Sequence, residues 1–219
     1  MAWEIDVVVV GPIQCNCYIL SDSITREAYI IDPGAESKDI IRHLEKSKFD
    51  LKAALITHAH LDHVGGIEML HHAIPVPVYY HGGDQPLYLN LSMQAELFGF
   101  SLKELQAVQP TIGDPSLKDQ QEFPIASGSI RVIHTPGHTP GSVCFHATGG
   151  QQAIFTGDTL FEGSIGRTDL WGGSFEQIMD SIRNRLMTLD DDLPVLPGHG
   201  AATTIGEERA SNPFLQDRY

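Results

Sequence analysis

Four residues with metal-binding side chains lie within six consecutive positions of this chain: His58, His60, Asp62 and His63. Imidazole nitrogens and carboxylate oxygens are the ordinary ligands of zinc and of non-haem iron. Side chains two positions apart share a face of an extended chain but not of a helix, so the first three could converge. His63 follows Asp62 directly and points elsewhere unless the chain bends. The spacing therefore predicts either a tight turn around one ion or two ions side by side.

Three further residues of the same chemical kind follow apolar runs of the sequence. His138 comes after the run SIRVIHT, Asp158 comes after QAIFTG, and His199 comes after PVLPG. Each lies beside glycine or proline, and loops at the carboxyl ends of strands are where α/β folds build sites. We interpret all three as candidate metal ligands.

The composition of the 219-residue chain argues against several classes of partner. Hydrophobic residues make up 42% of the sequence, enough for a substantial core, and the formal net charge is −14. Nucleic acids and anionic membranes need clustered Lys and Arg, so neither is an expected partner. Glu4 and Asp6 lie where a signal peptide carries positive charge, and no apolar run is as long as a membrane span. We expect a cytoplasmic protein.

The three cysteines are an odd number and imply no disulfide framework. Cys15 and Cys17 lie in the apolar run CNCYIL, and cysteine is among the most buried residue types. We interpret both as core residues rather than as a thiolate pair.

Strand-like and helix-like runs alternate along the chain with no linker between them. Strands are predicted at 3–10, 15–20, 26–31, 51–57, 76–81, 122–126, 129–135, 142–147, 152–157 and 195–200. Helices are predicted at 36–48, 67–73, 174–189 and 205–212, with an irregular helical stretch at 84–104. This order predicts an α/β protein with two sheets and outer helices, in one domain that spans residues 1–219.

Four motifs in this order give the chain a family resemblance. They are HxHxDH at 58–63, TPGHTPG at 135–141, GDTLF at 157–161 and PGHG at 197–200. Together they resemble the metallo-β-lactamase superfamily, and Asp32 in IDPG fits that family's early supporting aspartate. The resemblance covers the whole chain and implies an αββα sandwich of two mixed β-sheets with helices on the outer faces.

The resemblance also implies a ligand set for two divalent metal ions. One ion would take His58, His60 and His138, and the second would take Asp62, His63 and His199, with Asp158 bridging both. Zinc is the expected metal, and iron or manganese would accept the same nitrogen and oxygen donors. His134 is expected to be a supporting neighbour. The other histidines match no motif and are interpreted as packing or surface residues: His43, His71, His72, His81 and His146.

Two divalent ions lower the pKa of a shared water to about 7, so a metal-bound hydroxide can act as the nucleophile. No further catalytic side chain is then expected, and the sequence has no GxSxG motif. A thiolate, with a pKa of about 8.5, leaves without a general acid. This chemistry fits the cleavage of a small-molecule thioester.

Within the superfamily, the chain is most similar to compact bacterial enzymes of the glyoxalase II type, which are hydroxyacylglutathione hydrolases. The segments TPGHTPGSVCF, GDTLF and GHGAATTIGEERASNPFL carry this likeness. The sequence ends twenty residues after His199, so the family's helical glutathione-binding domain is not expected. Either the stretch 84–118 covers the pocket, with Tyr88, Met93 and Phe98 in its wall, or a partner subunit covers it, or the substrate is not glutathione-based.

Other activities of the same fold are alternatives. Persulfide dioxygenases use one iron on two histidines and an aspartate, and they share a segment like Gly166-Arg167-Thr168-Asp169. Arg167 either holds a substrate carboxylate or pairs with Asp169 to fix a loop. Lactonase chemistry is a further alternative, and the oligomeric state is left open. A non-catalytic binding protein is disfavoured because all seven candidate ligands are present.

Overall fold

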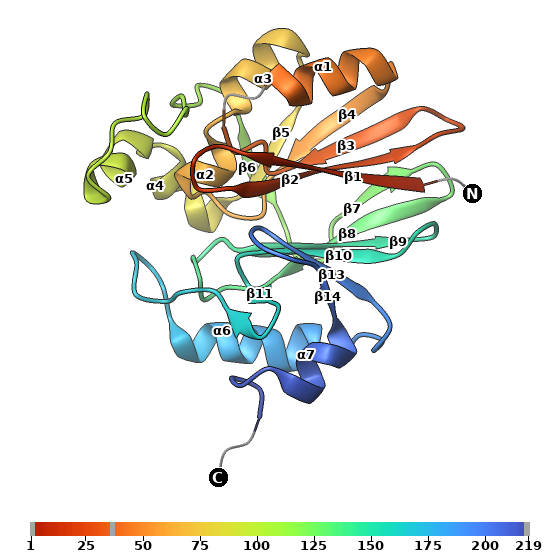
Figure 1. Cartoon of the computed structure of the whole chain (residues 1–219), viewed down its shortest axis with the longest axis vertical. Coiled ribbons are helices and arrows are strands. Elements are labelled where there is room, and N and C mark those ends of the chain that lie inside the picture. The colour runs from red at the N-terminus through yellow and green to blue at the C-terminus, as the bar shows by residue number, and fades with distance from the viewer. Residues whose placement is uncertain (1–2, 36–37, 217–219) are drawn as a thin grey trace.

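Two six-stranded β-sheets lie face to face, and helices cover the outer face of each (Figure 1). The structure is a computed structural model that describes residues 3–35 and 38–216. Both sheets contain parallel and antiparallel pairs. The predicted αββα arrangement of two mixed sheets is therefore confirmed.

The first sheet contains the N-terminal strands in chain order. The first three pair antiparallel, and the third to the sixth pair parallel. The strands are β1 (Trp3–Val10), β2 (Cys15–Asp22), β3 (Glu27–Ile31), β4 (Asp50–Leu55), β5 (Val78–His81) and β6 (Asp114–Leu117). Every residue of β2 is buried, because this strand is covered on both faces.

The second sheet has the order β14-β13-β10-β9-β8-β7, in which only β10 and β13 pair parallel. Its strands are β7 (Glu122–Ile125), β8 (Gly128–His134), β9 (Val143–Thr148), β10 (Ala153–Gly157), β13 (Pro194–Pro197) and β14 (Thr203–Thr204). A small hairpin of β11 (Leu160–Phe161) and β12 (Ser164–Ile165) follows β10.

The helices fall into two groups (Figure 1). Those on the side of the first sheet are α1 (Lys38–Ser47), α2 (Leu61–Val64), α3 (Ile67–Ala73), the 3-10 turn η1 (Gly82–Asp84), α4 (Gln85–Tyr88) and α5 (Leu91–Leu97). The second sheet is covered by α6 (Phe175–Ser181), the π-helical turn η2 (Ile182–Leu186) and α7 (Ile205–Ser211). In the described ranges, no helix has the length and apolar character needed to cross a membrane.

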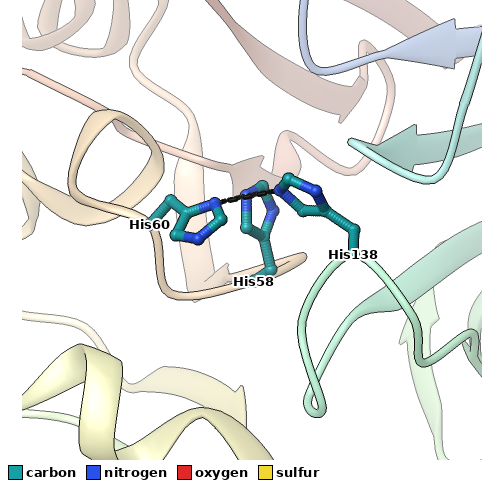
Figure 2. A group of neighbouring side chains, drawn as sticks. All are labelled: His58, His60 and His138. Atoms are coloured by element: carbon teal, nitrogen blue, oxygen red, sulfur yellow. Dashed lines mark hydrogen bonds between the residues drawn. The ribbon is translucent and has the colours of Figure 1, made fainter. Parts of the chain in front are cut away.

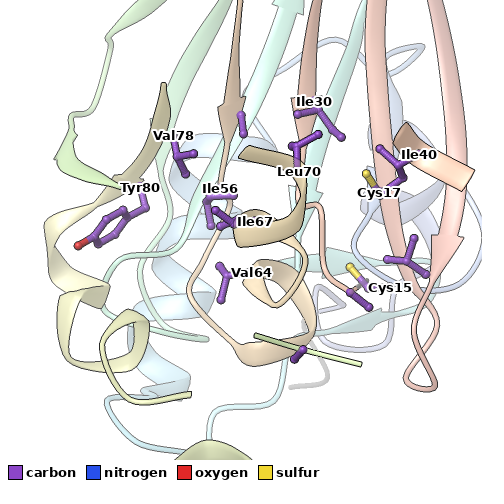
Figure 3. Close-up of a cluster of buried hydrophobic side chains, with 14 of the residues drawn as sticks. Cys15, Cys17, Ile30, Ile40, Ile56, Val64, Ile67, Leu70, Val78 and Tyr80 are labelled. Atoms are coloured by element: carbon purple, nitrogen blue, oxygen red, sulfur yellow. The ribbon is translucent and has the colours of Figure 1, made fainter. Parts of the chain in front are cut away.

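Three layers of buried apolar side chains hold these elements together. The outer layer, under α1 and α3, contains Ile40 and Leu44 of α1. Figure 3 shows Ile40 beside other members of this layer. The middle layer joins the inner faces of the sheets, and the third packs α6, η2 and α7 onto the second sheet. Cys15 and Cys17 lie in the outer layer under α1 and α3 as free, buried thiols, which confirms their interpretation as core residues.

Several predicted elements differ in detail. The helix predicted at 36–48 is seen as α1 from Lys38, while positions 36–37 lie outside the described residues. The stretch 84–104 divides into short helices, and Gly99, with φ of +74°, follows the end of α5. The helix predicted at 174–189 is seen as α6 and η2, and Ser174 caps its start by accepting a hydrogen bond from the backbone N–H of Gln177. Strand β6 was not predicted, since Asp114-Pro115 argues against a strand.

Candidate metal centre

The structure brings all seven candidate ligands to one place, at the ends of strands from both sheets. The HxHxDH segment follows β4 of the first sheet. The other three residues belong to the second sheet: His138 lies in the β8–β9 loop, Asp158 directly follows β10, and His199 follows β13. The structure therefore brings the side chains of these strand-end loops together.

Three imidazoles form the first group and point toward one another (Figure 2). Nε2 of His138 lies 3.2 Å from Nε2 of His58 and 2.9 Å from Nδ1 of His60, and the latter two atoms are 3.1 Å apart. Tetrahedral zinc with bonds of about 2.0–2.1 Å holds its ligand nitrogens about 3.3 Å apart, so the triangle is close to what an ion needs.

The protonation of this group also suits a metal. Burial lowers the pKa of His60 to about 3 and lowers the pKa of His58 well below its usual value, and the neighbouring imidazoles add to both effects. Both rings are therefore neutral at pH 7, with lone pairs free for a ligand bond. Nδ1 of His138 donates to the backbone carbonyl of Arg167 at 2.8 Å, which leaves Nε2 as the acceptor atom that faces the group.

The second group contains Asp62, His63 and His199. Nε2 of His199 lies 3.1 Å from Oδ2 of Asp62 and 3.3 Å from Nε2 of His63. The other ring nitrogen of His63 and of His199 makes a hydrogen bond outside the group. Nδ1 of His63 donates to Asp32 at 2.9 Å, and Nδ1 of His199 donates to the carbonyl of Gln14 at 3.1 Å. The early aspartate thus supports a ligand, as the resemblance implies.

Asp158 lies between the two groups. Its Oδ1 is 3.4 Å from Nε2 of His63, and its Oδ2 is 3.6 Å from Nε2 of His138. Burial would raise the pKa of this carboxyl, but the charges of His63, His138 and His199 outweigh burial and lower it. Oδ1 is buried and has no hydrogen-bond partner among the described residues. A buried carboxylate oxygen without a donor is costly, so the donor set fits a divalent cation beside Asp158.

A one-turn helix supplies the bend that the spacing of His58 to His63 requires. Residue His60 is extended, with ψ of 150°, and α2 begins directly after it. This turn brings Asp62 and His63 to the second group while His58 and His60 face the first. Gly34 is needed beside the turn, because a Cβ atom there would lie 1.6 Å from the carbonyl oxygen of Asp62.

Gly198 has a similar role on the opposite side of the centre. A Cβ atom on Gly198 would lie 2.4 Å from Oδ1 of Asp158 and 2.7 Å from Cε1 of His63. The glycine of the PGHG motif therefore lets the backbone pass close to the side chains of Asp158 and His63.

Two buried residues that the sequence analysis missed hold the ligand loops. Asp84 accepts hydrogen bonds from the backbone N–H groups of Ala59 (2.9 Å) and Gly141 (2.6 Å) and from the Thr139 hydroxyl (2.7 Å). It thereby links the loop of His58 and His60 to the loop of His138. Burial raises its pKa. The available signal was an acidic residue beside glycines after a predicted strand, in HGGD.

Gln94, on α5, is the second of these residues. Its amide donates to the carbonyl of Ala59 at 3.0 Å and accepts from the N–H of Leu61 at 3.0 Å. The side chain therefore clamps the backbone on both sides of His60, and it connects the irregular helical stretch to the metal centre.

Within the described residues, the remaining histidines belong to neither the first nor the second group. His134 stacks on His81 with ring centroids 4.2 Å apart and donates to the carbonyl of Pro140 at 3.0 Å. The His134 ring therefore supports the backbone of the loop that carries His138 and is not itself a candidate ligand. His43 pairs with Asp6 at 3.1 Å.

Two adjoining cavities open beside the centre. One, of about 290 Å³, is lined by residues of both ligand groups together with Ile13, Phe100 and Arg167. The other, of about 400 Å³, is mostly apolar and includes Met93 and Phe98, two of the three residues predicted for the pocket wall.

The prediction for Tyr88 is wrong. This side chain is buried in the outer core layer, the one under α1 and α3. It stacks on Tyr80 with ring centroids 4.1 Å apart and donates a hydrogen bond to the carbonyl of Ile112. The short helix α4 instead turns Leu87 toward the apolar cavity. Of the two predicted roles of Arg167, the structure shows the pairing, because its guanidinium binds Asp169 at 2.7 and 2.9 Å. Arg167 also lines the metal cavity.

Comparison with known proteins identifies the family. A family model, metallo-beta-lactamase superfamily, matches residues 10–199. Hydroxyacylglutathione hydrolase GloC of Haemophilus influenzae is 38% identical over 219 residues, covering 98% of this chain and 99% of that protein.

Two solved structures are 35% identical to the chain. BLEG-1 B3 metallo-beta-lactamase superposes with a TM-score of 0.87, and the match covers 97% of this chain and 100% of the BLEG-1 chain. TTHA1623 in a di-iron-bound form superposes with a TM-score of 0.84, and the match covers 96% of this chain and 100% of the TTHA1623 chain. From the sequence match and the shared fold, the chain belongs to the metallo-beta-lactamase superfamily.

Proposed function

We propose that the protein is a metal-dependent hydrolase of hydroxyacylglutathione-type thioesters. The observation that carries the proposal is the position of Asp158, whose two carboxylate oxygens face two separate metal-competent groups. The similarity to a hydroxyacylglutathione hydrolase along nearly the full length of both chains supports the substrate class.

The proposed ligands are those of the two groups around Asp158. His58, His60 and His138 would hold one ion, and Asp62, His63 and His199 would hold the other. Bound divalent ions lower the pKa of water and polarise a carbonyl, which are the two requirements of acyl transfer to water. The di-iron form of TTHA1623 supports iron as an alternative to zinc.

The side chains of the metal cavity favour attack by water. In the described part of the chain, its lining contains no serine, threonine or cysteine. Burial raises the pKa of the nearby Cys15 thiol to about 12, so that residue is not a nucleophile at neutral pH. A thiolate leaving group needs no proton donor, which makes a thioester a better substrate here than an amide.

The backbone and the carboxylates hold the imidazoles in position for this chemistry. The carbonyl of Arg167 orients His138, Asp32 orients His63, and the carbonyl of Gln14 orients His199. These contacts fix which nitrogen faces the centre, so no reorganisation is needed when substrate binds.

The test is hydrolysis of S-lactoylglutathione by purified protein, with metal content measured on the same sample. We expect thioester loss that depends on bound metal and stops after chelation. Absence of hydrolysis by protein that contains two metal equivalents would reject the proposal.

A persulfide dioxygenase is the second candidate, because Arg167 of the segment Gly166-Arg167-Thr168-Asp169 lines the metal cavity. An iron-loaded sample separates the two activities. Oxygen uptake with glutathione persulfide, without hydrolysis of S-lactoylglutathione, would favour the dioxygenase.

A further inference from the structure

We propose, building on the thioester hydrolase function, that the apolar cavity beside His60 binds the acyl group of the substrate. The preferred substrates are then thioesters of a medium-length alkyl or aromatic acyl group, rather than of the small, polar lactoyl group. We call this cavity the acyl pocket; its walls are Leu87, Met93, Leu97, Phe98, Leu170 and Trp171, with His60, Gln94 and Glu96.

The walls of the acyl pocket leave large apolar side chains in contact with water. Leu97 is 71% exposed, Met93 58%, Trp171 53% and Phe98 41%. They come from two segments, α5 with the residue after it and the loop before α6, that face each other across the cavity. Concave apolar surfaces of this size, about 400 Å³, are typical of small-molecule sites.

The acyl pocket is continuous with the metal centre. His60, Gln94, Phe98 and Leu170 line both the acyl pocket and the metal cavity. His60 belongs to the first metal-competent group, so a carbonyl placed at the centre has one substituent directed toward the pocket.

Charge decides which half of the thioester enters the acyl pocket. Glutathione carries two carboxylates, and the one side chain with a full charge among the pocket's described lining residues is Glu96, which is an anion. The metal cavity, in contrast, is lined by Arg167, and its two carboxylates, Asp62 and Asp158, are proposed metal ligands. The anionic thiol half therefore fits on the side of Arg167, and the acyl half fits among Leu97, Phe98 and Trp171.

The first experiment compares S-octanoylglutathione with S-lactoylglutathione on metal-loaded protein. Because each buried methylene strengthens binding about fourfold, burial of three methylenes or more gives the octanoyl thioester at least a tenfold higher kcat/KM. An equal or lower kcat/KM for the octanoyl thioester would overturn the acyl pocket and leave the hydrolase function intact.

A matched pair of variants locates the effect. Leu97→Gln places a polar group in the acyl pocket, whereas Leu89→Gln changes a similarly exposed leucine (58%) that is not among the residues lining either cavity. We expect Leu97→Gln to reduce the octanoyl-to-lactoyl ratio of kcat/KM about tenfold and Leu89→Gln to leave the ratio unchanged. Equal ratios in both variants would contradict the proposal.

A binding measurement separates the pocket from catalysis. Octanoate titrated into the protein should change the fluorescence of Trp171 at a concentration at least tenfold lower than acetate does, and Trp171→Phe should remove the signal. Failure of hydrolysis with intact octanoate binding would reject the hydrolase function alone. If octanoate has no effect and Leu97→Gln converts a dimer to a monomer in sedimentation, a second copy covers this surface and the acyl pocket is rejected.

Discussion

The carboxylate of Asp84 accepts a hydrogen bond of 2.9 Å from the backbone N–H of Ala59, the residue between His58 and His60. The same carboxylate binds Gly141 and Thr139 in the loop that carries His138. The three residues of the first metal-competent group therefore depend on one buried side chain whose hydrogen bonds go to Ala59, Thr139 and Gly141 rather than to their rings.

Substitution of Asp84 should disturb the loops before it disturbs the sheets. We expect Asp84→Ala to lower the free energy of unfolding by about 2–4 kcal/mol, because buried donors lose their acceptor, and to weaken metal binding at least tenfold. Urea unfolding and chelator competition measure the two effects. Asp192→Ala, at an exposed position, is the control, and unchanged metal affinity in Asp84→Ala would contradict the positioning role.

Loss of Asp158 should affect both proposed ions. Because its oxygens face His63 and His138, we expect Asp158→Ala to lose both metal equivalents and at least 10³-fold in kcat. Metal analysis of the dialysed variant, alongside the hydrolysis assay, makes the measurement. A variant that keeps one ion would show that Asp158 serves a single ion, and full activity would reject its bridging role.

Metal removal should make stability sensitive to acid. Burial lowers the pKa values of His58 and His60 below the value of about 6.5 that applies in the unfolded chain. The unfolded state therefore binds protons first, so the stability present above pH 6.5 is lost as the pH falls toward the folded pKa values.

The pKa values of His63 and His199 are instead raised, so their protonation offsets part of this loss. We therefore expect the Tm of chelated protein to fall by about 2–4 °C between pH 7.5 and pH 5.5. Metal-loaded protein should lose less, until protons displace the ions. His72→Gln, at an exposed histidine, is the control and should behave as the unmodified protein. Equal losses with and without metal would show that other groups dominate.

Arg167 should act on substrate binding more than on turnover. Because it lines the metal cavity, we expect Arg167→Gln to raise the KM for S-lactoylglutathione about tenfold and to change kcat less than threefold. Arg131→Gln, at another exposed arginine paired with a carboxylate (3.0 Å), is the matched control. A change in kcat alone would assign Arg167 to loop positioning.

The Arg167–Asp169 pair makes a separate prediction for titration. The hydrogen bonds from Arg167 lower the pKa of Asp169 from its ordinary 3.8 to about 2. The carboxylate is therefore ionised above that value and is neutralised only as the pH falls through about 2. In Arg167→Gln, carboxyl NMR shifts should report a pKa near the ordinary value.

The metal-competent residues could be predicted from sequence because each one lies in a local pattern. His138, Asp158 and His199 lie within four residues of the ends of strands, and their glycines mark the close approach of the backbone. Asp84 could not be found in this way, since its partners, two backbone N–H groups and one hydroxyl, lie 25 to 57 positions away. Tyr88 was misplaced because α4 has only one turn, so the helical phase of Leu87 and Tyr88 depends on tertiary packing.

The centre takes its donors from both sheets, four side chains after β4 and three after strands of the second sheet. Ions held there would cross-link two halves of the chain, since the donors His63 and His199 lie 136 positions apart. Demetallation should therefore loosen the docking of one sheet on the other while each keeps its own backbone pairing. Hydrogen exchange would then quicken first in the loops between the sheets, well before β2 or β9.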